Sequence, residues 1–113
     1  MEQSSNMKSL FIIVNAGYSS DIVEIAREAG ARGATILNAR GSSAKSSQTI
    51  MGITVDSEKE IILCLSEEAT AKRIMAAVKE KAGYGTPAHS VCFVMPVEKM
   101  IGASNGNVDP IAE

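Results

Sequence analysis

The 113-residue sequence predicts a single α+β domain, in which two helices pack on one face of an antiparallel sheet. Two stretches with helical hydrophobic spacing alternate with strand-length apolar runs. The element order is therefore strand-helix-strand, an extra hairpin, and strand-helix-strand again. Apolar residues make up 45% of the chain and aromatic residues only 4%, with no Trp. The core must therefore be built from Ile, Val, Leu, Ala and Met.

The first strand is predicted at Ser9–Asn15, because SLFIIVN is a continuous apolar run. A turn over residues 16–21 follows, and Ser19 or Ser20 is expected to cap the next helix by accepting from its free N–H groups. Gly30 is expected to end that helix. The residues that form its apolar stripe are Ile22, Val23, Ile25, Ala26 and Ala29.

A second strand is predicted at Gly33–Arg40, followed by a polar segment, Gly41–Gln48, with four serines and a single charge. Such a segment cannot bury enough apolar area to order itself, so it is expected to be mobile. Thr49–Val55 then reads as a strand, residues 56–57 as a tight turn, and Glu58–Leu65 as a further strand.

Residues 66–68, Ser-Glu-Glu, are expected to cap a second helix that runs to about Ala82. A polar loop, Gly83–Ser90, leads into the last strand, Val91–Met95, which Pro96 ends. The side chains predicted to face inward from the second helix are Ala69, Ile74, Ala77 and Val78.

This order fits a ferredoxin-like βαββαβ sandwich with an extra β-hairpin, whose sheet has one open face. The apolar runs Leu10–Val14 and Ile61–Leu65 scarcely alternate, so both faces of the sheet need cover. One chain supplies helices for only one face, which indicates an oligomer. Residues 1–8 are expected to form a flexible N-terminus, 9–104 the domain and 105–113 a C-terminal tail.

Composition excludes several classes of function. The net charge is −2 and no basic tract is present, which argues against nucleic acid as a partner. The apolar runs are too short to span a bilayer and no signal region is visible, so the protein is expected to be cytoplasmic. Cys64 and Cys92 sit in apolar runs and suit buried, reduced thiols. The single His has no carboxylate cluster near it in sequence, which disfavours a metal site. With one His and no matched acid, no nucleophile–base–acid arrangement can be assembled, so no enzyme is expected.

The loop before the last strand carries glycines, a hydroxyl and an imidazole, a combination that can present backbone N–H groups to an anion. An ordinary turn between a helix and a strand is the alternative. His89 is interpreted either as a phosphate or ribose ligand or as a solvent-exposed loop residue.

The chain resembles the PII-type signalling proteins and their broader PII-like superfamily over roughly Met7 to Ser104. Four patches carry the resemblance: the first strand with its Ser-Asp helix start, AGARGATILNARG, EIILCLSEEA and FVMPVEKM. Their joint order and spacing matter more than any single patch. The resemblance implies a homotrimer with nucleotide sites between neighbouring subunits. It also implies a mobile T-loop after the second strand that docks on a partner.

The resemblance implies a site with three parts, with no metal required. Gly85 to Ser90 would be the phosphate loop, and its backbone together with the hydroxyls of Thr86 and Ser90 would donate to phosphate. The backbone at Leu63 and Cys64 would meet the adenine edge. The residues that would border the adenine and the ribose are Ile13, Thr35, Arg40, Gly41 and Ser42. The residues implied for the whole site are Ile13, Thr35, Arg40, Gly41, Ser42, Leu63, Cys64, Gly85, Thr86, Pro87, Ala88, His89 and Ser90.

The departures from the family pattern bear on the ligand. The loop position where the family usually has Lys is Val91 here, and Gly102 and Ser104 stand where two Arg residues usually follow the last strand. Since each charge-assisted contact is worth roughly 1.5–3 kcal/mol, ADP or AMP is expected to bind in preference to ATP. Arg40 and Lys45 remain as cations.

Three functions follow from this pattern. The first is a trimeric, nucleotide-binding regulator of a membrane transporter or metabolic enzyme, with a short T-loop at about Ser42–Gln48 that contains no Tyr. The second is a CutA-like structural or metal-linked trimer without a nucleotide role. The third is a slow nucleotide hydrolase, for which the sequence offers no general base.

Overall fold

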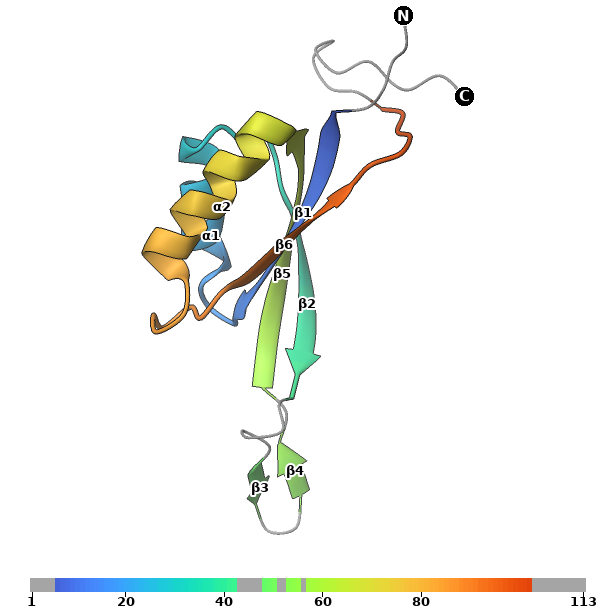
Figure 1. The fold of residues 1–113 in the computed structure, drawn as a ribbon. Coiled ribbons are helices and arrows are strands. Elements are labelled where there is room, and N and C mark those ends of the chain that lie inside the picture. Colours follow the sequence, from blue (N-terminus) through green and yellow to red (C-terminus); the bar gives the residue numbers. More distant parts are fainter. Residues whose placement is uncertain (1–5, 43–47, 51–52, 56, 103–113) are drawn as a thin grey trace, which may run out of the picture.

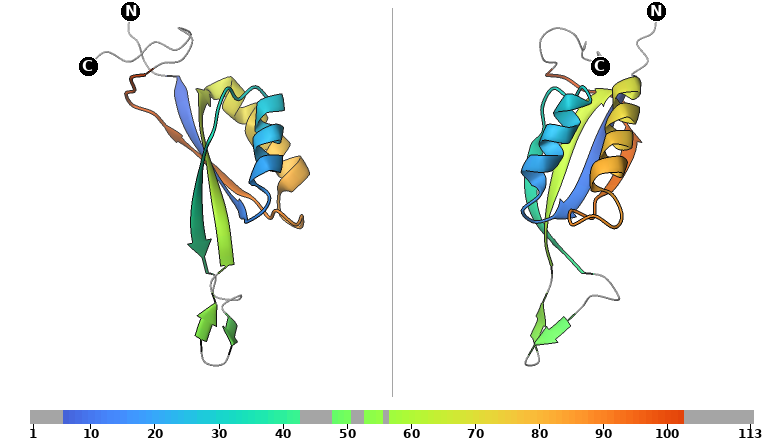
Figure 2. Two further views of the ribbon diagram at one scale, coloured as in Figure 1. Left: turned by 180° about the vertical axis from the view of Figure 1, so that it is seen from behind. Right: turned by 90° about the vertical axis from the view of Figure 1, so that its left-hand side faces the viewer.

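A computed structural model describes residues 6–42, 48–50, 53–55 and 57–102 of the chain (Figure 1). The strands and helices follow the predicted order, with two helices on one side of a four-stranded antiparallel sheet (Figures 1 and 2). The elements are β1 (Met7–Asn15), α1 (Ser19–Glu28), β2 (Thr35–Gly41), β3 (Gln48–Ile50), β4 (Ile53–Val55), β5 (Ser57–Glu67), α2 (Glu68–Ala82) and β6 (Val91–Pro96).

The strand order in the sheet is β2-β5-β1-β6, and every neighbouring pair is antiparallel. The two long strands β1 and β5 form its centre. This is the ferredoxin-like sandwich that the sequence predicts. β1 begins at Met7, two residues before the predicted start, and Met7 is buried.

The hydrophobic core lies between the sheet and the helices. Side chains alternate along β1, so Leu10, Ile12 and Val14 point to the helices and are fully buried. They pack against Ile62 of β5 and Ile74 of α2. The predicted stripe of α1 is confirmed, because Ile22 and Ala26 are buried and Val23, Ile25 and Ala29 pack against the same core.

Neither α1 nor α2 packs on the opposite face of the sheet, called the open face below. The register places Phe11 beside Leu63 and Phe93, and Ile13 beside Ile61 and Val91, all on this face. Large apolar side chains here are nearly half exposed in the single chain: Leu37, Leu65, Val91, Phe93 and Met95. The prediction that apolar residues line both faces is therefore confirmed.

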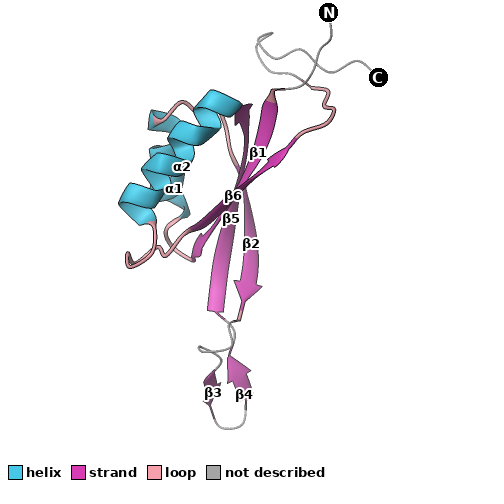
Figure 3. Ribbon diagram, viewed as in Figure 1, coloured by secondary structure: helices cyan, strands magenta, loops and turns pink. Residues whose placement is uncertain are grey.

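The extra hairpin is present but differs from its predicted form. Thr49–Val55 was predicted to be one strand, and this is wrong, because Gln48–Ile50 and Ile53–Val55 are two short strands that pair with each other (Figure 3). β5 pairs instead with β1 and β2. The segment between β2 and β5 therefore spans residues 42–56 rather than ending near Gln48, and its hairpin extends beyond the end of the sheet (Figure 1).

Capping of α1 also differs from the prediction. Neither Ser19 nor Ser20 makes a side-chain cap. One carboxylate oxygen of Glu60, on β5, instead accepts from the backbone N–H groups of Gly17 and Ser19, each at 3.2 Å. At the other end the prediction is confirmed, because Gly30 has a φ of +119° and donates to the Arg27 carbonyl, while Ala31 N–H donates to Ala26.

The second helix begins at Glu68 without a side-chain cap, so the predicted capping by Ser66 is wrong. The Ser66 side chain lies buried on the helix side of β5, and its hydroxyl has no hydrogen-bond partner among the described residues. The inward prediction is confirmed for Ile74 and Val78 and wrong for Ala69, which is exposed while Ala71 is buried.

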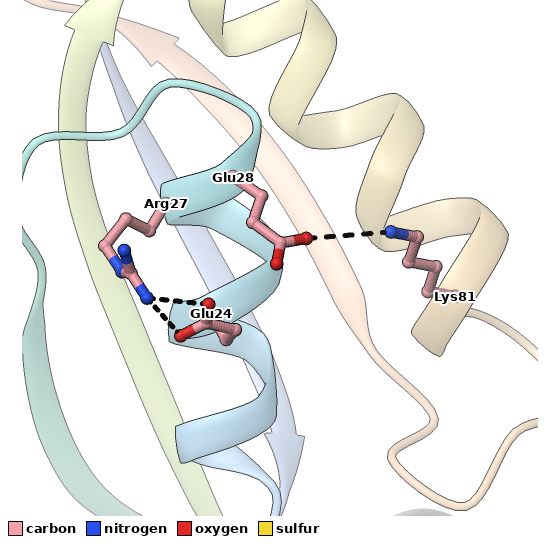
Figure 4. A network of polar contacts seen from close by, with 4 residues as sticks. All are labelled: Glu24, Arg27, Glu28 and Lys81. Atoms are coloured by element: carbon pink, nitrogen blue, oxygen red, sulfur yellow. Dashed lines mark hydrogen bonds and ion pairs between the residues drawn. The ribbon is translucent and has the colours of Figure 1, made fainter.

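Ion pairs on the helices lie at the surface. Arg27 donates to both carboxylate oxygens of Glu24, at 2.5 and 2.6 Å, and Lys81 of α2 approaches Glu28 of α1 at 4.0 Å (Figure 4). The hydrogen bond to Glu24, followed by its charge, raises the pKa of Arg27. Such exposed pairs add little to stability, so the helix pair is held chiefly by the core beneath it.

Candidate functional site

Within one protomer, the predicted site residues fall into two groups at opposite ends of the sheet. Thr35 begins β2 beside Leu63, whereas Gly41 ends β2 beside Ser57. At a rise of roughly 3.3 Å per residue, the two ends of β2 are about 20 Å apart. A ligand of nucleotide size cannot contact both groups within one protomer.

The first group surrounds a cavity of about 830 Å³ where the α1–β2 connection passes the end of β5. Thr35 and Leu63 line this cavity, and so does Gly102 after the last strand. Two arginines that sequence reasoning did not single out, Arg32 and Arg73, also line it. Arg73 is held by its Nε, which donates to the Ala29 carbonyl, and by one terminal nitrogen, which donates to the Thr70 hydroxyl.

The backbone of β5 is open on one side at this cavity. β2 pairs with β5 only as far as Leu63, so the β2 side of residues 64–67 has no neighbouring strand. The Cys64 side chain points the other way and is buried in the core. Cys64 is not among the residues that line the cavity, whereas its neighbours Leu63 and Leu65 are.

The second group lies at the other end of the sheet, where the loop after α2 docks on β1. The backbone N–H of Asn15 donates to the Ala88 carbonyl at 3.0 Å, and its side-chain Nδ2 donates to the Pro87 carbonyl at 2.9 Å. Its Oδ1 accepts from Lys59 Nζ at 2.7 Å. The stem of Lys59 lies against Gly41, where an added Cβ would be 3.3 Å from Lys59 Cγ. Asn15 and Lys59 thus join the loop to the end of β2.

The loop Gly83–Ser90 is closed by its own hydrogen bonds. The N–H of Thr86 donates to the Gly83 carbonyl, that of His89 to the Thr86 hydroxyl, and that of Ser90 to the Ala82 carbonyl. The Thr86 hydroxyl donates to Gly83 at 2.7 Å, and the Ser90 hydroxyl is buried without a partner among the described residues.

Few loop donors are therefore free. Within Gly85–Ser90, the N–H groups of Gly85 and Ala88 are the ones left without a partner among the described residues. Gly85 has a φ of +90°, a conformation that favours glycine. Gly83 is required for packing, since an added Cβ would lie 2.6 Å from the Lys79 carbonyl oxygen. The loop offers a small, fixed set of donors rather than a continuous cradle.

His89 is exposed and adopts a left-handed backbone, with a φ of 50°. Its ring lies beside Tyr84, with ring centroids 5.6 Å apart. Tyr84 is 93% exposed. Sequence reasoning passed over it, although an aromatic residue between two glycines was a visible signal.

The other predicted residues lie as follows. Ile13 is on the open face, opposite Val91 of β6. The register places Arg40 opposite Glu58, on the other face of the sheet from Lys59. Ser42 is exposed just after β2. Lys45 and Ser104 lie outside the described residues.

The described part of the chain contains neither a candidate metal cluster nor a candidate membrane-spanning helix. No group of three or more His, Cys, Asp or Glu side chains gathers there in a way that could hold a metal ion. Both cysteines are free thiols, Cys64 buried and Cys92 half-buried. Within the same residues, neither α1 nor α2 has the length and apolar character that a membrane-spanning helix requires.

Comparison with solved structures shows the same fold in several proteins. A PII-like signalling protein from Thermus thermophilus matches with a TM-score of 0.63 and 23% identity, covering 80% of this chain and 86% of that one. GlnK of B. subtilis, solved in complex with ATP, matches with a TM-score of 0.67 and 16% identity, covering 88% and 89%.

CPII of Thiomonas intermedia K12, a nitrogen regulatory PII-like protein bound to ADP, AMP and bicarbonate, matches with a TM-score of 0.62 and 17% identity, covering 86% and 93%. No curated protein sequence matches the chain. The model of the family "Nitrogen regulatory protein P-II" matches residues 7–107, nearly the whole chain. The chain therefore belongs to the P-II family of signalling proteins.

Proposed function

We propose that this protein is a homotrimeric sensor that binds ADP or AMP between protomers and regulates a partner protein. The observation that carries this proposal is the division of the candidate site. Within one protomer, the cavity with its open strand edge lies at one end of the sheet. The loop Gly83–Ser90 lies at the other end. A second copy is needed to bring the two ends together.

The open face supports the oligomer. A nearly continuous apolar surface covers this face of the four strands and includes Phe11, Phe93 and Leu37, as is typical of a protein–protein interface. A second and third copy of the chain would bury it. In such an assembly the cavity of one protomer would lie near the loop of the next.

The chemistry of each half fits part of an adenine nucleotide. The unpaired backbone of β5 beyond Leu63 can exchange hydrogen bonds with a base, and Thr35 adds a hydroxyl. At the loop end, the N–H groups of Gly85 and Ala88 can meet one or two phosphates. Val91, opposite Ile13, offers no charge to a third phosphate. ADP and AMP are therefore favoured over ATP.

The partner surface is assigned to the segment between β2 and β5, residues 42–56. Its β3–β4 hairpin stands apart from the helices and from the four-stranded sheet (Figure 1). A membrane transporter or a metabolic enzyme is the proposed class of partner. No metal is required for this function, and no catalytic step is part of it.

Thermal-shift measurements test this function directly. The protein would be titrated with AMP, ADP, ATP, a cyclic adenine nucleotide, GDP and adenosine, because a ligand that binds only the native state raises the apparent unfolding temperature. We expect ADP and AMP to give the largest shifts. A stable trimer that none of these nucleotides shifts would contradict the sensor and favour a structural role.

A further inference from the structure

Lys59 is a cation that sequence reasoning left out of the site. It lies on β5 between Asn15 of β1 and Ala39 of β2, so its side chain is on the open face. It is half-buried, and no carboxylate of the described residues lies within 4 Å of its ammonium group. Its one hydrogen bond is to Asn15 Oδ1, at 2.7 Å.

Asn15 fixes where this ammonium group lies. Two bonds to the carbonyls of Pro87 and Ala88 hold Asn15 against the loop, and these bonds turn Oδ1 toward Lys59. On the other side the stem of Lys59 packs on Gly41. The charge is therefore held between the end of β2 and the loop that carries the free N–H groups of Gly85 and Ala88.

No other cation of the described strands shares this position. Among the described strand residues on the open face Lys59 is the only cation, because Arg40 projects from the opposite face of β2. The neighbouring site residues Ile13 and Val91 are apolar. An ammonium group has three N–H donors, and Asn15 uses one of them, so two remain for a ligand.

We propose that Lys59 is the phosphate-binding cation of the site and sets its preference for phosphorylated ligands over nucleosides. This role rests on the proposed nucleotide function. The ammonium group would meet a phosphate oxygen at the loop end, where the family pattern has its cation at the position of Val91. A single cation with the Gly85 and Ala88 N–H groups matches one or two phosphates better than three.

Calorimetric titration with ADP, AMP and adenosine separates this role from a structural one. The set would be the wild type, Lys59→Met, Lys59→Gln, Lys59→Arg and Lys72→Met. Lys59→Gln keeps hydrogen-bond donors for Asn15 without the charge. Lys72 is exposed on α2, away from the loop, and serves as the matched control.

We expect Lys59→Met and Lys59→Gln to weaken ADP binding about tenfold or more and adenosine binding by less than about twofold. Lys59→Arg and Lys72→Met should bind ADP nearly as the wild type does. Oligomer size and unfolding temperature would be measured for every variant. If Lys59→Met does not fold, Lys59→Gln tests whether ADP binding needs the charge of Lys59.

Two outcomes would overturn the inference while leaving the sensor intact. One is wild-type ADP affinity in Lys59→Gln, and the other is an equal loss for ADP and adenosine, which would mean that Lys59 only positions Asn15 and the loop. A wild-type protein that binds no adenine nucleotide would overturn the proposed function itself, and the role of Lys59 with it.

Discussion

Phe11 and Phe93 stack on the open face of the sheet, with ring centroids 5.1 Å apart and planes within 6° of parallel. They lie directly opposite each other on the neighbouring strands β1 and β6. Phe93 is 41% exposed in the single chain. Two stacked rings on an uncovered apolar face are typical of a surface that another copy of the chain buries.

Replacing Phe93 with Glu should dissociate the oligomer, because an unpaired carboxylate in an apolar interface carries a large desolvation cost. Sedimentation velocity should show a trimer for the wild type at micromolar concentration and smaller species for the variant. Glu98→Gln, which changes a carboxylate at an exposed position, is the control and should remain trimeric. A wild-type monomer at that concentration would remove the shared site altogether.

Glu60 should matter more to α1 than the serines at its start do. Glu60→Ala removes the acceptor for the N–H groups of Gly17 and Ser19, so we expect a loss of about 1 kcal/mol of unfolding free energy. Ser20→Ala should change it little, since Ser20 makes no cap. Urea denaturation monitored by circular dichroism measures both, and the reverse ranking would mean that Ser20 caps the helix in solution.

The fold could be predicted from the sequence because it depends on hydrophobic periodicity. The strands β1, β5 and β6, the stripe of α1 and the stop at Gly30 all follow from local patterns. The cap by Glu60 could not be predicted in this way, since it joins residues 41 and 43 positions apart that meet only when β5 packs beside the α1 start. Local serines were the only capping signal within reach of the sequence.

The candidate site was predictable in outline only. Family resemblance indicated Thr35, Leu63 and the loop, but the Asn15–Lys59 contact links residues 44 positions apart through strand register. Arg32 and Arg73 likewise line one cavity because the α1–β2 connection, β5 and α2 all border it. The turn within the β3–β4 hairpin could not be predicted, because TIMGITV contains no strong turn pair and its apolar run favours a single strand.

Arg40→Ala should weaken ADP binding by about threefold to tenfold in calorimetric titration, since an exposed cation at the end of β2 contributes through a partly screened charge. The wild type should bind ADP more tightly than ATP, and it should also bind AMP more tightly than ATP. Arg27→Ala, which removes an exposed arginine of α1, is the matched control. Tighter binding of magnesium–ATP than of ADP would show that other cations, such as Arg32 or Arg73, serve the third phosphate.

Deleting residues 43–47 should abolish partner binding and leave the oligomer intact, because the deletion removes no residue of the two helices or the four-stranded sheet. Co-purification from the native host, with and without ADP, measures partner binding. Light scattering measures the size of the oligomer. Undiminished capture of the same partner by the deletion variant would assign docking to another surface.

Stability should decrease at alkaline pH partly because of the thiols. Burial, with a smaller contribution from Cys64, raises the pKa of Cys92 from its ordinary value of 9.0 to about 11, and burial raises the pKa of Cys64 as well. Between about pH 9 and 11 the unfolded chain loses thiol protons that the native state retains, so the unfolded state is favoured as pH rises. Urea denaturation at pH 8 and 10.5 should show a smaller decrease for Cys92→Ala than for the wild type. Equal decreases would mean that the Cys92 thiol ionises as freely in the native state as in the unfolded chain.

The separation of Thr35 from Gly41 along β2 has a genetic consequence for a ring of three protomers. Each ligand would be held by the cavity end of one protomer and the loop end of its neighbour, so a defect in either end spoils only the sites to which that end contributes. A protomer defective in the cavity and one defective in the loop would each be inactive in a ring of their own kind. Assembled together, they would pair one intact cavity with one intact loop, and a single working site would reappear by intersubunit complementation.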